Sequence, residues 1–253
     1  MNELPSQNPI HVIGVDASGL ETLNLPSQKL VLNAKGVAAP KRLLTSLQNW
    51  LKEQGNKSFP KIVETDQPDS LITWLNQQAG LTVVLASGDP LWFGIGRRLV
   101  ASIPKERLHF HPAPSSLQLA FSRLGRPWQD TSWISIHGRE SEPLDEKLKQ
   151  WPSALVVLTD PTKSGAEEIK QILFSSGLES AYELWIFERL GHPNERIQRV
   201  MPNKSIPKNL HPLHLVVLLA KSFPLPAPSK LPLFGLDDGV FIQHKDRPGL
   251  MTK

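Results

Sequence analysis

The chain has 253 residues, of which 40% are hydrophobic and 21% charged, a composition typical of a folded globular protein rather than a disordered one. It contains no cysteine, which excludes disulfides, cysteine-ligated zinc and a thiol nucleophile. The net charge of +4 would suit contact with nucleic acid or with a polycarboxylate metabolite, but an ordinary soluble surface is the plainer explanation.

Two further classes of protein are disfavoured by the sequence. The longest apolar run, residues 213–220, is too short to cross a bilayer, and the first ten residues lack the basic start and apolar core of a secretory signal. We therefore expect a cytoplasmic protein with no membrane association. The eight histidines are scattered and form no HExxH-type pair, so no metal site is predicted.

The first half of the chain alternates predicted strands and helices. The apolar run at residues 10–15 predicts a strand, and helical spacing follows at 41–51 and at 71–75. Residues 81–86 are continuous, short and rich in β-branched side chains, as in a buried parallel strand. A helix is predicted from about residue 91 to residue 102.

The second half repeats this alternation after a connector at residues 112–116 that contains two prolines. Ser115 or Ser116 is a suitable N-cap for a helix that runs to about Leu124. The apolar spacing of Ile169, Ile172 and Leu173 predicts another helix. The predicted strands of this half are residues 133–137, 154–159, 183–187 and 213–220. Three tryptophans are expected in the core: Trp128, Trp133 and Trp185.

This order of elements predicts an α/β protein with two domains and mostly parallel sheets, residues 1–112 and 113–222. Closely spaced prolines then favour an extended linker at residues 223–253. The chain is expected to be the front part of a longer protein.

Polar turns follow two predicted strands of the first half. Gly14–Gly19 would let a ligand approach the backbone, although Asp16 stands where a dinucleotide fingerprint has its middle glycine; an ordinary strand-to-helix turn is the alternative. Gly88-Asp89-Pro90 places a carboxylate and backbone amides at the carboxyl end of a sheet, where open α/β folds bind ligands. A simple turn closed by the Asp89 side chain explains the same residues. Gly94 and Gly96 favour a ligand lying close.

Similar turns end two strands of the second half, at Leu158-Thr159-Asp160 and at Glu188-Arg189-Leu190. The guanidinium of Arg189 could offer a planar fork to a substrate carboxylate, whereas without further context Glu188 and Arg189 are ordinary surface residues. His137 is a conceivable general base, or a structural hydrogen-bonding group.

Taken together, these segments resemble the tetrapyrrole methylase family, and within it the precorrin-6Y C5,15-methyltransferase group. The matching stretches follow the family's order over about residues 10–220 and include VIGVDASGLETL, VLASGDPLWFGIGRRLV, HPAPSSLQLAFSRLGRPWQD and LWIFERLGHPNERIQR. The resemblance implies two α/β domains with a ligand cleft between them, the class III fold of S-adenosylmethionine methyltransferases.

The resemblance also implies roles for particular residues. Those expected to bind S-adenosylmethionine are Gly88, Asp89, Pro90, Leu91, Ser115, Ser116, Leu158, Thr159, Arg189 and Leu190. In the first turn the family usually carries Gly-Pro where this chain has Asp16 and Ala17. Asp16, Ala17 and Arg189 are expected to border the tetrapyrrole substrate. Candidates for a proton acceptor, not separable from the sequence, are Asp89, Asp160 and Glu188.

The implied activity is methylation of C5 of a precorrin macrocycle in cobalamin biosynthesis. The implied partners are a second copy, as a homodimer, and a decarboxylating methyltransferase domain that would begin near the end of this chain. Basic residues available for the substrate carboxylates are Arg97, Arg98, Arg123, Arg139, Lys163 and Arg189. Two alternatives are a ribosomal-RNA methyltransferase of the same superfamily and a non-catalytic module that binds S-adenosylmethionine or tetrapyrrole and needs its C-terminal partner. Charges are scattered rather than arranged in a basic stripe, so nucleic acid is not expected.

Overall fold

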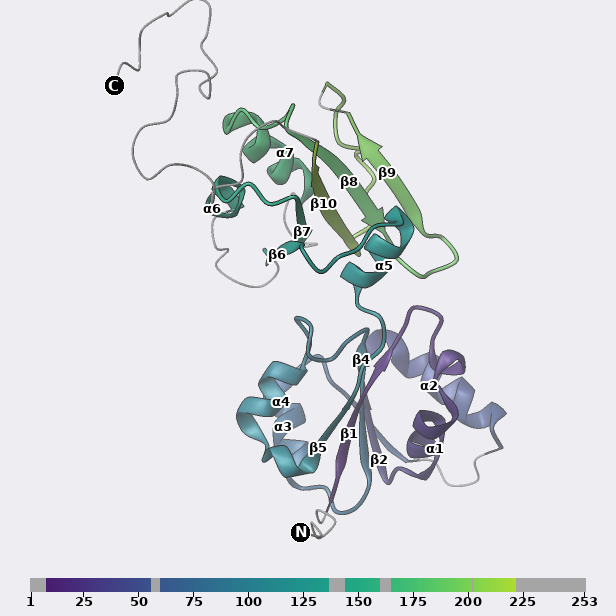
Figure 1. Cartoon of the computed structure of the whole chain (residues 1–253). Helices are drawn as coiled ribbons and strands as arrows, with labels where there is room; N and C mark the ends of the chain where they lie inside the picture. The colour runs from purple at the N-terminus through teal and green to yellow at the C-terminus, as the bar shows by residue number, and fades with distance from the viewer. Residues whose placement is uncertain (1–7, 56–59, 137–143, 160–164, 202, 222–253) are drawn as a thin grey trace, which may run out of the picture. The chain divides into compact units, whose positions relative to one another are not determined.

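The computed structural model describes residues 8–55, 60–136, 144–159, 165–201 and 203–221. Their contacts divide the chain into two compact units (Figure 1). The first unit contains the described residues of Met1–Trp128 together with Phe187–Arg196, and the second those of Gln129–Ile186 and Ile197–Lys253.

The first unit is built on a five-stranded sheet with the strand order β3-β2-β4-β1-β5. All of its neighbouring strands run parallel. The two longest strands are β4, at the centre of the sheet, and β1, next to it. Both are buried almost throughout, as expected for continuous apolar runs. The strands are β1 (Ile10–Val15), β2 (Gly36–Ala39), β3 (Lys61–Glu64), β4 (Thr82–Ser87) and β5 (Leu108–His111).

Helices cover both faces of this sheet (Figure 1). On one face lie α1 (Leu25–Asn33) and α2 (Lys41–Glu53), whose apolar side chains form a core with Ile13, Val83 and Leu85. On the other face lie α3 (Pro68–Asn76) and α4 (Gly96–Ser102), which form a second core with Val12 and Val84. Because side chains alternate along a strand, β1 contributes to both cores. Two short 3₁₀ helices, η1 (Leu20–Thr22) and η2 (Lys105–Arg107), complete this part of the unit.

Helix α5 (Ser116–Leu124) begins where the sequence predicts. Ser115 is its N-cap: the Ser115 hydroxyl accepts the Gln118 N–H at 3.3 Å, and the Gln118 side chain accepts the Ser115 N–H at 2.8 Å. This reciprocal pair is a capping box, which satisfies two backbone donors that a helix start leaves unpaired. Gly125 ends the helix in the left-handed conformation.

Replacing Ser115 with alanine should lower the free energy of unfolding by about 1 kcal/mol, because the cap's acceptor is lost. Urea unfolding of Ser115→Ala measures this change. Ser116→Ala, one residue further on and inside the helix, is the matched control and should stay close to wild type. Equal effects of the two substitutions would contradict the capping role.

The second unit contains a mixed sheet with the strand order β6-β7-β10-β8-β9. β6 runs parallel to β7, whereas β10 runs antiparallel to β7. Among the described residues between β8 and β10 there is no helix, and parallel neighbours would need such a crossover. The elements are β6 (Ser132–Ser135), α6 (Leu144–Lys149), β7 (Ala154–Leu158), α7 (Ala166–Ser175), β8 (Tyr182–Glu188), β9 (Arg196–Val200) and β10 (His214–Ala220). α6 and α7 pack on the sheet around Leu155, Val157 and Ile186.

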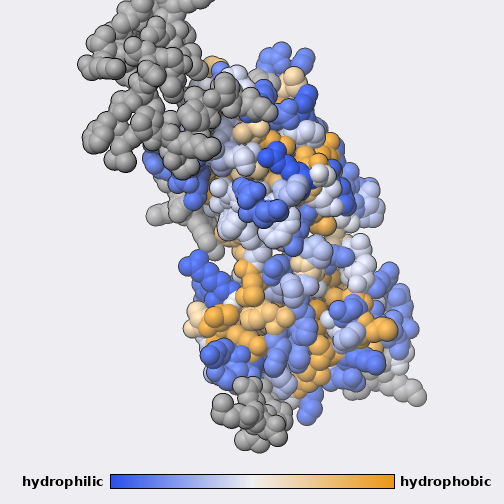
Figure 2. Space-filling model, in the orientation of Figure 1, coloured by the Kyte–Doolittle hydropathy of each residue, from blue (hydrophilic) through white to orange (hydrophobic). Residues whose placement is uncertain are grey.

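The α/β fold is confirmed, and three expectations about its details are wrong. The helix predicted from residue 91 begins only at Gly96. The second sheet is mixed rather than mostly parallel. Trp128 and Trp133 are 46% and 47% exposed instead of buried in the core. Figure 2 shows how hydrophobic residues mix with hydrophilic ones on the visible surface of each unit.

The predicted domain boundary at residues 112 and 113 stays a prediction; by contacts, α5 groups with the first unit. The predicted linker, residues 223–253, lies outside the described residues. Among the described residues, no helix has the length and apolar character needed to cross a membrane.

Candidate active site

The carboxyl ends of β4, β1 and β5 bring three backbone segments into contact. The Gly88 N–H donates to the Val15 carbonyl at 2.9 Å, and the Ala113 N–H donates to the Gly88 carbonyl at 3.4 Å. A β-carbon on Gly14 would lie only 2.1 Å from the Gly88 oxygen and 2.5 Å from the Ala113 nitrogen. Glycine is therefore required at position 14, because only bare backbone allows the three strand ends to approach this closely.

Two predicted cofactor residues, Gly88 and Ser115, meet at this junction. Gly88 has a φ of +59°, and a β-carbon there would lie 3.5 Å from the Ser115 Cα and 3.1 Å from the Pro114 oxygen. The turn after β4 and the start of α5 are thus neighbours at the carboxyl edge of a parallel sheet, which is where open α/β folds bind ligands.

The Asp89 side chain closes the next turn. Its Oδ1 accepts the Leu91 N–H at 2.9 Å, so the simple Asx turn considered from the sequence does form. This bond uses one carboxylate oxygen and leaves Oδ2 without a hydrogen bond in the described part of the chain. Pro90 is buried, whereas Leu91 is 57% exposed. The turn therefore presents an acceptor oxygen and an apolar side chain.

Gly94 and Gly96 are explained by this loop itself rather than by a ligand. A β-carbon on either residue would lie 2.6 Å from the Pro90 carbonyl oxygen. The Gly96 N–H donates to the same oxygen at 2.9 Å. These glycines fold the loop onto its own backbone, which is reason enough for glycine at both positions, and a ligand lying close to them stays a prediction.

The first turn, after β1, is ordered by Asp16. The Asp16 Oδ1 accepts the Ser18 N–H at 2.9 Å and the Thr22 hydroxyl at 2.8 Å. The Asp16 carbonyl also accepts the Gly19 N–H at 3.3 Å. Asp16 thus shapes the turn, and its neighbour Ala17 is half-buried.

The loop between β8 and β9 lies against this first turn. A β-carbon on Gly191 would lie 3.1 Å from the Ala17 β-carbon and 3.6 Å from Leu119 of α5. Arg189 and Leu190 directly precede Gly191, so two of the segments predicted to border the substrate do come together. Arg189 has a φ of +52°, a conformation that is unfavourable for residues with a side chain and that is often found at functional sites.

Glu188 is unsuited to act as a proton acceptor. Its side chain is 2% exposed, and both its oxygens bind the Arg196 guanidinium, at 2.5 and 2.7 Å. This pairing raises the pKa of Arg196, chiefly through the hydrogen bonds that its guanidinium donates to Glu188. A carboxylate held at both oxygens by a guanidinium fixes structure rather than taking up protons.

In the second unit, Thr159 is buried and its hydroxyl donates to the His214 carbonyl at 2.6 Å, which ties the end of β7 to the start of β10. Leu158 is half-buried just before it. Asp160 lies outside the described residues, as do His137, Arg139 and Lys163. Within the described part of the chain, histidines and carboxylates form no group of three that could hold a metal ion.

Residues 9–201 match the family model described as Tetrapyrrole (Corrin/Porphyrin) Methylases. The chain belongs to the tetrapyrrole methylase family. It is 28% identical to the decarboxylating precorrin-6Y C(5,15)-methyltransferase of Sinorhizobium sp over 248 residues, covering 96% of this chain but only 55% of that relative. It is 29% identical to the cobalt-precorrin-7 C(5)-methyltransferase of Salmonella typhimurium over 191 residues, covering 74% of this chain and 87% of the relative.

A solved structure shows the same fold. The uroporphyrin-III C-methyltransferase of Thermus thermophilus, complexed with S-adenosylhomocysteine, superposes with a TM-score of 0.57. The match covers 84% of the present chain and 92% of that chain at 17% identity. The family and the fold expected from the sequence are confirmed.

The arginines of this chain differ in whether a carboxylate binds them. Arg98 pairs with Asp69 at 2.6 Å, and Arg123 pairs with Glu195 at 2.7 Å. Arg189 forms no ion pair among the described residues, which makes it the most available of the predicted carboxylate-binding cations in the loops near the first turn. The sequence analysis did not single out Glu195. The only local signal was its position four residues after Gly191, whose N–H its carboxylate accepts.

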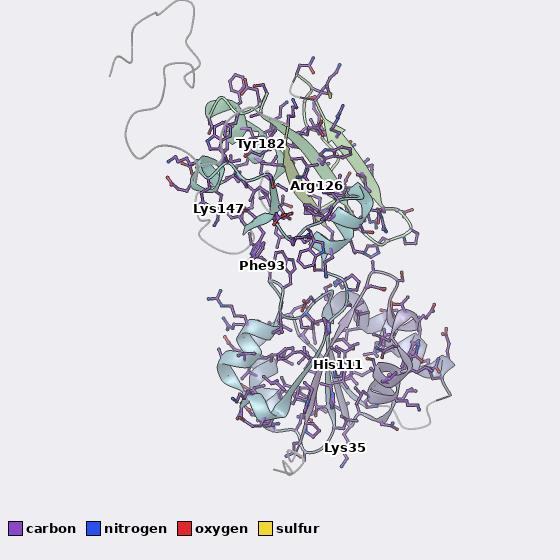
Figure 3. All side chains as sticks on the ribbon, viewed as in Figure 1. Lys35, Phe93, His111, Arg126, Lys147 and Tyr182 are labelled. Carbon is purple, nitrogen blue, oxygen red and sulfur yellow. The ribbon has the colours of Figure 1, made fainter. Side chains whose placement is uncertain are left out.

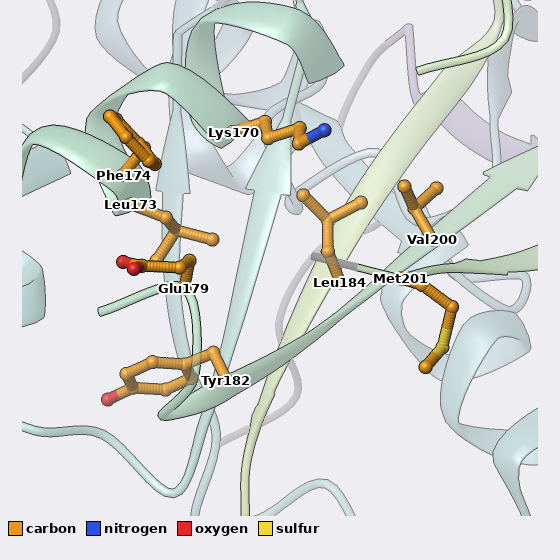
Figure 4. A pocket seen from close by; sticks show the side chains of 8 residues that line it. All are labelled: Lys170, Leu173, Phe174, Glu179, Tyr182, Leu184, Val200 and Met201. Carbon is orange, nitrogen blue, oxygen red and sulfur yellow. The ribbon is translucent and has the colours of Figure 1, made fainter. Parts of the chain in front are cut away.

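A pocket between α7 and the strands β8 and β9 is a separate feature (Figure 4). Tyr182 at its base donates its hydroxyl to the Pro152 carbonyl, and burial raises the pKa of Tyr182 to about 12. The pocket has room for only one or two water molecules, about 30 Å³, far less than S-adenosylmethionine needs. It is lined by Lys170, Leu173, Phe174, Glu179, Tyr182, Leu184, Val200 and Met201, and contains none of the predicted site residues.

Proposed function

We propose that this chain transfers a methyl group from S-adenosylmethionine to C5 of a precorrin macrocycle in cobalamin biosynthesis. The observation that carries the proposal is the junction of the β1, β4 and β5 ends, where Gly14, Gly88 and Ala113 bring bare backbone to the carboxyl edge of the first sheet. The family match and the names of the two precorrin-methylating relatives supply the substrate class.

The residues at this edge fit a nucleoside-bearing donor. The Asp89 Oδ2 is an acceptor for hydroxyl or amino groups, and the exposed Leu91 side chain offers an apolar contact. The remaining contacts that we assign to the donor come from Gly88, Pro90, Ser115, Ser116, Leu158, Thr159, Arg189 and Leu190. When bound, S-adenosylmethionine supplies a methyl group made electrophilic by its positively charged sulfur.

The chain's own contribution is to bind and orient. An enamine-like ring carbon of a reduced tetrapyrrole is already nucleophilic, so alignment of the two reactants is the main requirement. Asp16, Ala17 and Arg189 would line the substrate side, and the Arg189 guanidinium would bind a peripheral carboxylate. Asp89 and Asp160 stay as candidates for accepting the proton that the methylated ring carbon releases.

The proposal extends to partners and location. The Sinorhizobium relative is nearly twice as long as the matched region, and its name includes a decarboxylating activity. We propose that this chain works together with a C-terminal decarboxylating methyltransferase domain or subunit, as a homodimer in the cytoplasm.

The function is tested by mixing purified protein with a precorrin and S-adenosylmethionine carrying a labelled methyl group, and following the label into the macrocycle. Asp89→Ala should weaken S-adenosylmethionine binding about tenfold, as expected for the loss of one charged hydrogen-bond acceptor. Asp89→Asn keeps the acceptor for the Leu91 N–H but loses the charge, so it separates the turn's shape from binding.

The matched control is Asp69→Ala, which removes an 89% exposed carboxylate paired with Arg98 on the surface. It should bind S-adenosylmethionine like the wild type. Unchanged affinity in Asp89→Ala would contradict the assigned loop, and absence of label in the macrocycle, with both reactants bound, would contradict the proposed activity.

A further inference from the structure

The loop between β8 and β9, residues 189–195, is held in shape by Glu195. The Glu195 carboxylate accepts the Gly191 N–H at 2.6 Å within the loop. It also binds the Arg123 guanidinium of α5, at 2.7 and 3.3 Å. One side chain therefore closes the loop on itself and fastens it to a helix.

Backbone hydrogen bonds make this loop two consecutive turns. The His192 N–H donates to the Arg189 carbonyl at 2.9 Å, and the Glu195 N–H donates to the His192 carbonyl, also at 2.9 Å. Arg189 is held in the left-handed region, which a residue with a side chain keeps only where its surroundings impose it. The two turns and the Glu195 bonds are the surroundings that do so.

Charge is arranged unevenly around this loop. Arg123, Arg196 and Arg199 are each held by a glutamate, at 2.7, 2.5 and 2.8 Å. The hydrogen bond from Arg123 also lowers the pKa of Glu195, so the Glu195 carboxylate stays charged at neutral pH. Among the described residues, Arg189 forms no ion pair. It lies two residues before Gly191, which contacts Ala17 of the first turn.

We propose that Glu195 is a positioning residue: by joining Gly191 to Arg123 it holds the loop so that Arg189 can bind a carboxylate of the tetrapyrrole substrate. Glu195 itself touches no substrate. The proposal rests on the proposed function and adds the part of the chain that orients the substrate-binding cation.

Glu195→Gln tests it, because glutamine keeps an acceptor for the Gly191 N–H but loses the charge that holds Arg123. The Kd and KM for the precorrin of the turnover assay should rise about tenfold, with kcat within about twofold. Arg123→Gln breaks the same link from the other side and should give the same pattern. Glu183→Gln breaks the Arg199 ion pair on β8 and β9 and should leave both constants as in the wild type.

A double-mutant cycle with Arg189→Ala separates positioning from general structural damage. If Glu195 acts through Arg189, Arg189→Ala alone weakens precorrin binding and adding Glu195→Gln weakens it no further. Full additivity of the two substitutions, or unchanged precorrin affinity in Arg189→Ala, overturns the proposal while leaving methyl transfer by the wild type intact. A wild-type protein that binds no precorrin overturns both the proposed function and this inference.

Discussion

Gly14→Ala is expected to destabilise the first unit by about 3 kcal/mol or more, the upper end of the range for overpacked positions. The added β-carbon would lie 2.1 Å from the Gly88 oxygen and 2.5 Å from the Ala113 nitrogen. Both neighbours are backbone atoms at the ends of β4 and β5, so they can move only if the pairing of β1 with those strands loosens. Urea unfolding followed by circular dichroism measures the change.

Gly125→Ala is the control, because a β-carbon on Gly125 meets no atom within 4 Å and only the left-handed φ of +60° opposes it. That substitution should cost about 1 kcal/mol. If both variants lose the same stability, the close approach at Gly14 is not what makes glycine necessary there. Gly14→Ala should also weaken S-adenosylmethionine binding, since the same strand ends form the proposed donor edge.

Lowering the pH should destabilise the fold through the histidines of β1 and β5. His11 and His111 lie 2.9 Å apart between Nδ1 and Nε2, and the His11 ring stacks on His109 with centroids 4.8 Å apart (Figure 3, where His111 is labelled). Burial lowers the pKa of His11 to about 4, with further lowering by His109 and His111. Burial, and next the charge of His109, lowers the pKa of His111 as well.

A depressed histidine pKa means that the unfolded chain binds the proton more tightly than the folded one. The stabilisation is therefore complete above the unfolded value of 6.5 and is lost as the pH falls towards 4. Because His11 is partly exposed, solvent screening reduces its contribution to about 2 kcal/mol over that interval.

The measurement is the free energy of unfolding of wild type and His11→Gln between pH 7 and pH 4.5. The variant should lose less stability than the wild type over this interval, because glutamine does not titrate. Parallel curves for the two proteins would show that another group causes the acid sensitivity.

Strong apolar patterns made much of the fold predictable. β1 matches its predicted range, and β4, β7 and β10 match within one residue, because each is a continuous apolar run that both faces of a sheet bury. The start of α5 was equally clear, since serine followed three residues later by glutamine is a local signal that needs no tertiary context.

The elements that sequence reasoning missed have weak local signals. β3 has four residues with exposed ends, and β2 consists of small residues whose strand character comes only from their neighbours in the sheet. The helix expected from residue 91 failed at its start because Gly94 and Gly96 pack on the Pro90 carbonyl and form a turn. Such contacts within a loop are invisible in residue spacing.

For the candidate site, the sequence located the turns but not the roles of their side chains. Gly88 and Ser115 lie together as the parallel order of strands requires. Glu188 was a candidate base from the sequence. In the structure it forms an ion pair with Arg196, which lies eight residues later at the start of β9. The link from Arg123 to Glu195 spans 72 residues and could not be inferred without the fold.

The position of β10 has a consequence for synthesis on the ribosome. This last strand of the described chain lies in the middle of the second sheet, between β7 and β8. Until it emerges from the exit tunnel, β6 with β7 and β8 with β9 are two pairs that lack the strand between them. The first unit's sheet, complete by residue 111, can close much earlier, so nascent chains should pass through a stage in which one half is native and the other exposes unpaired strands to chaperones.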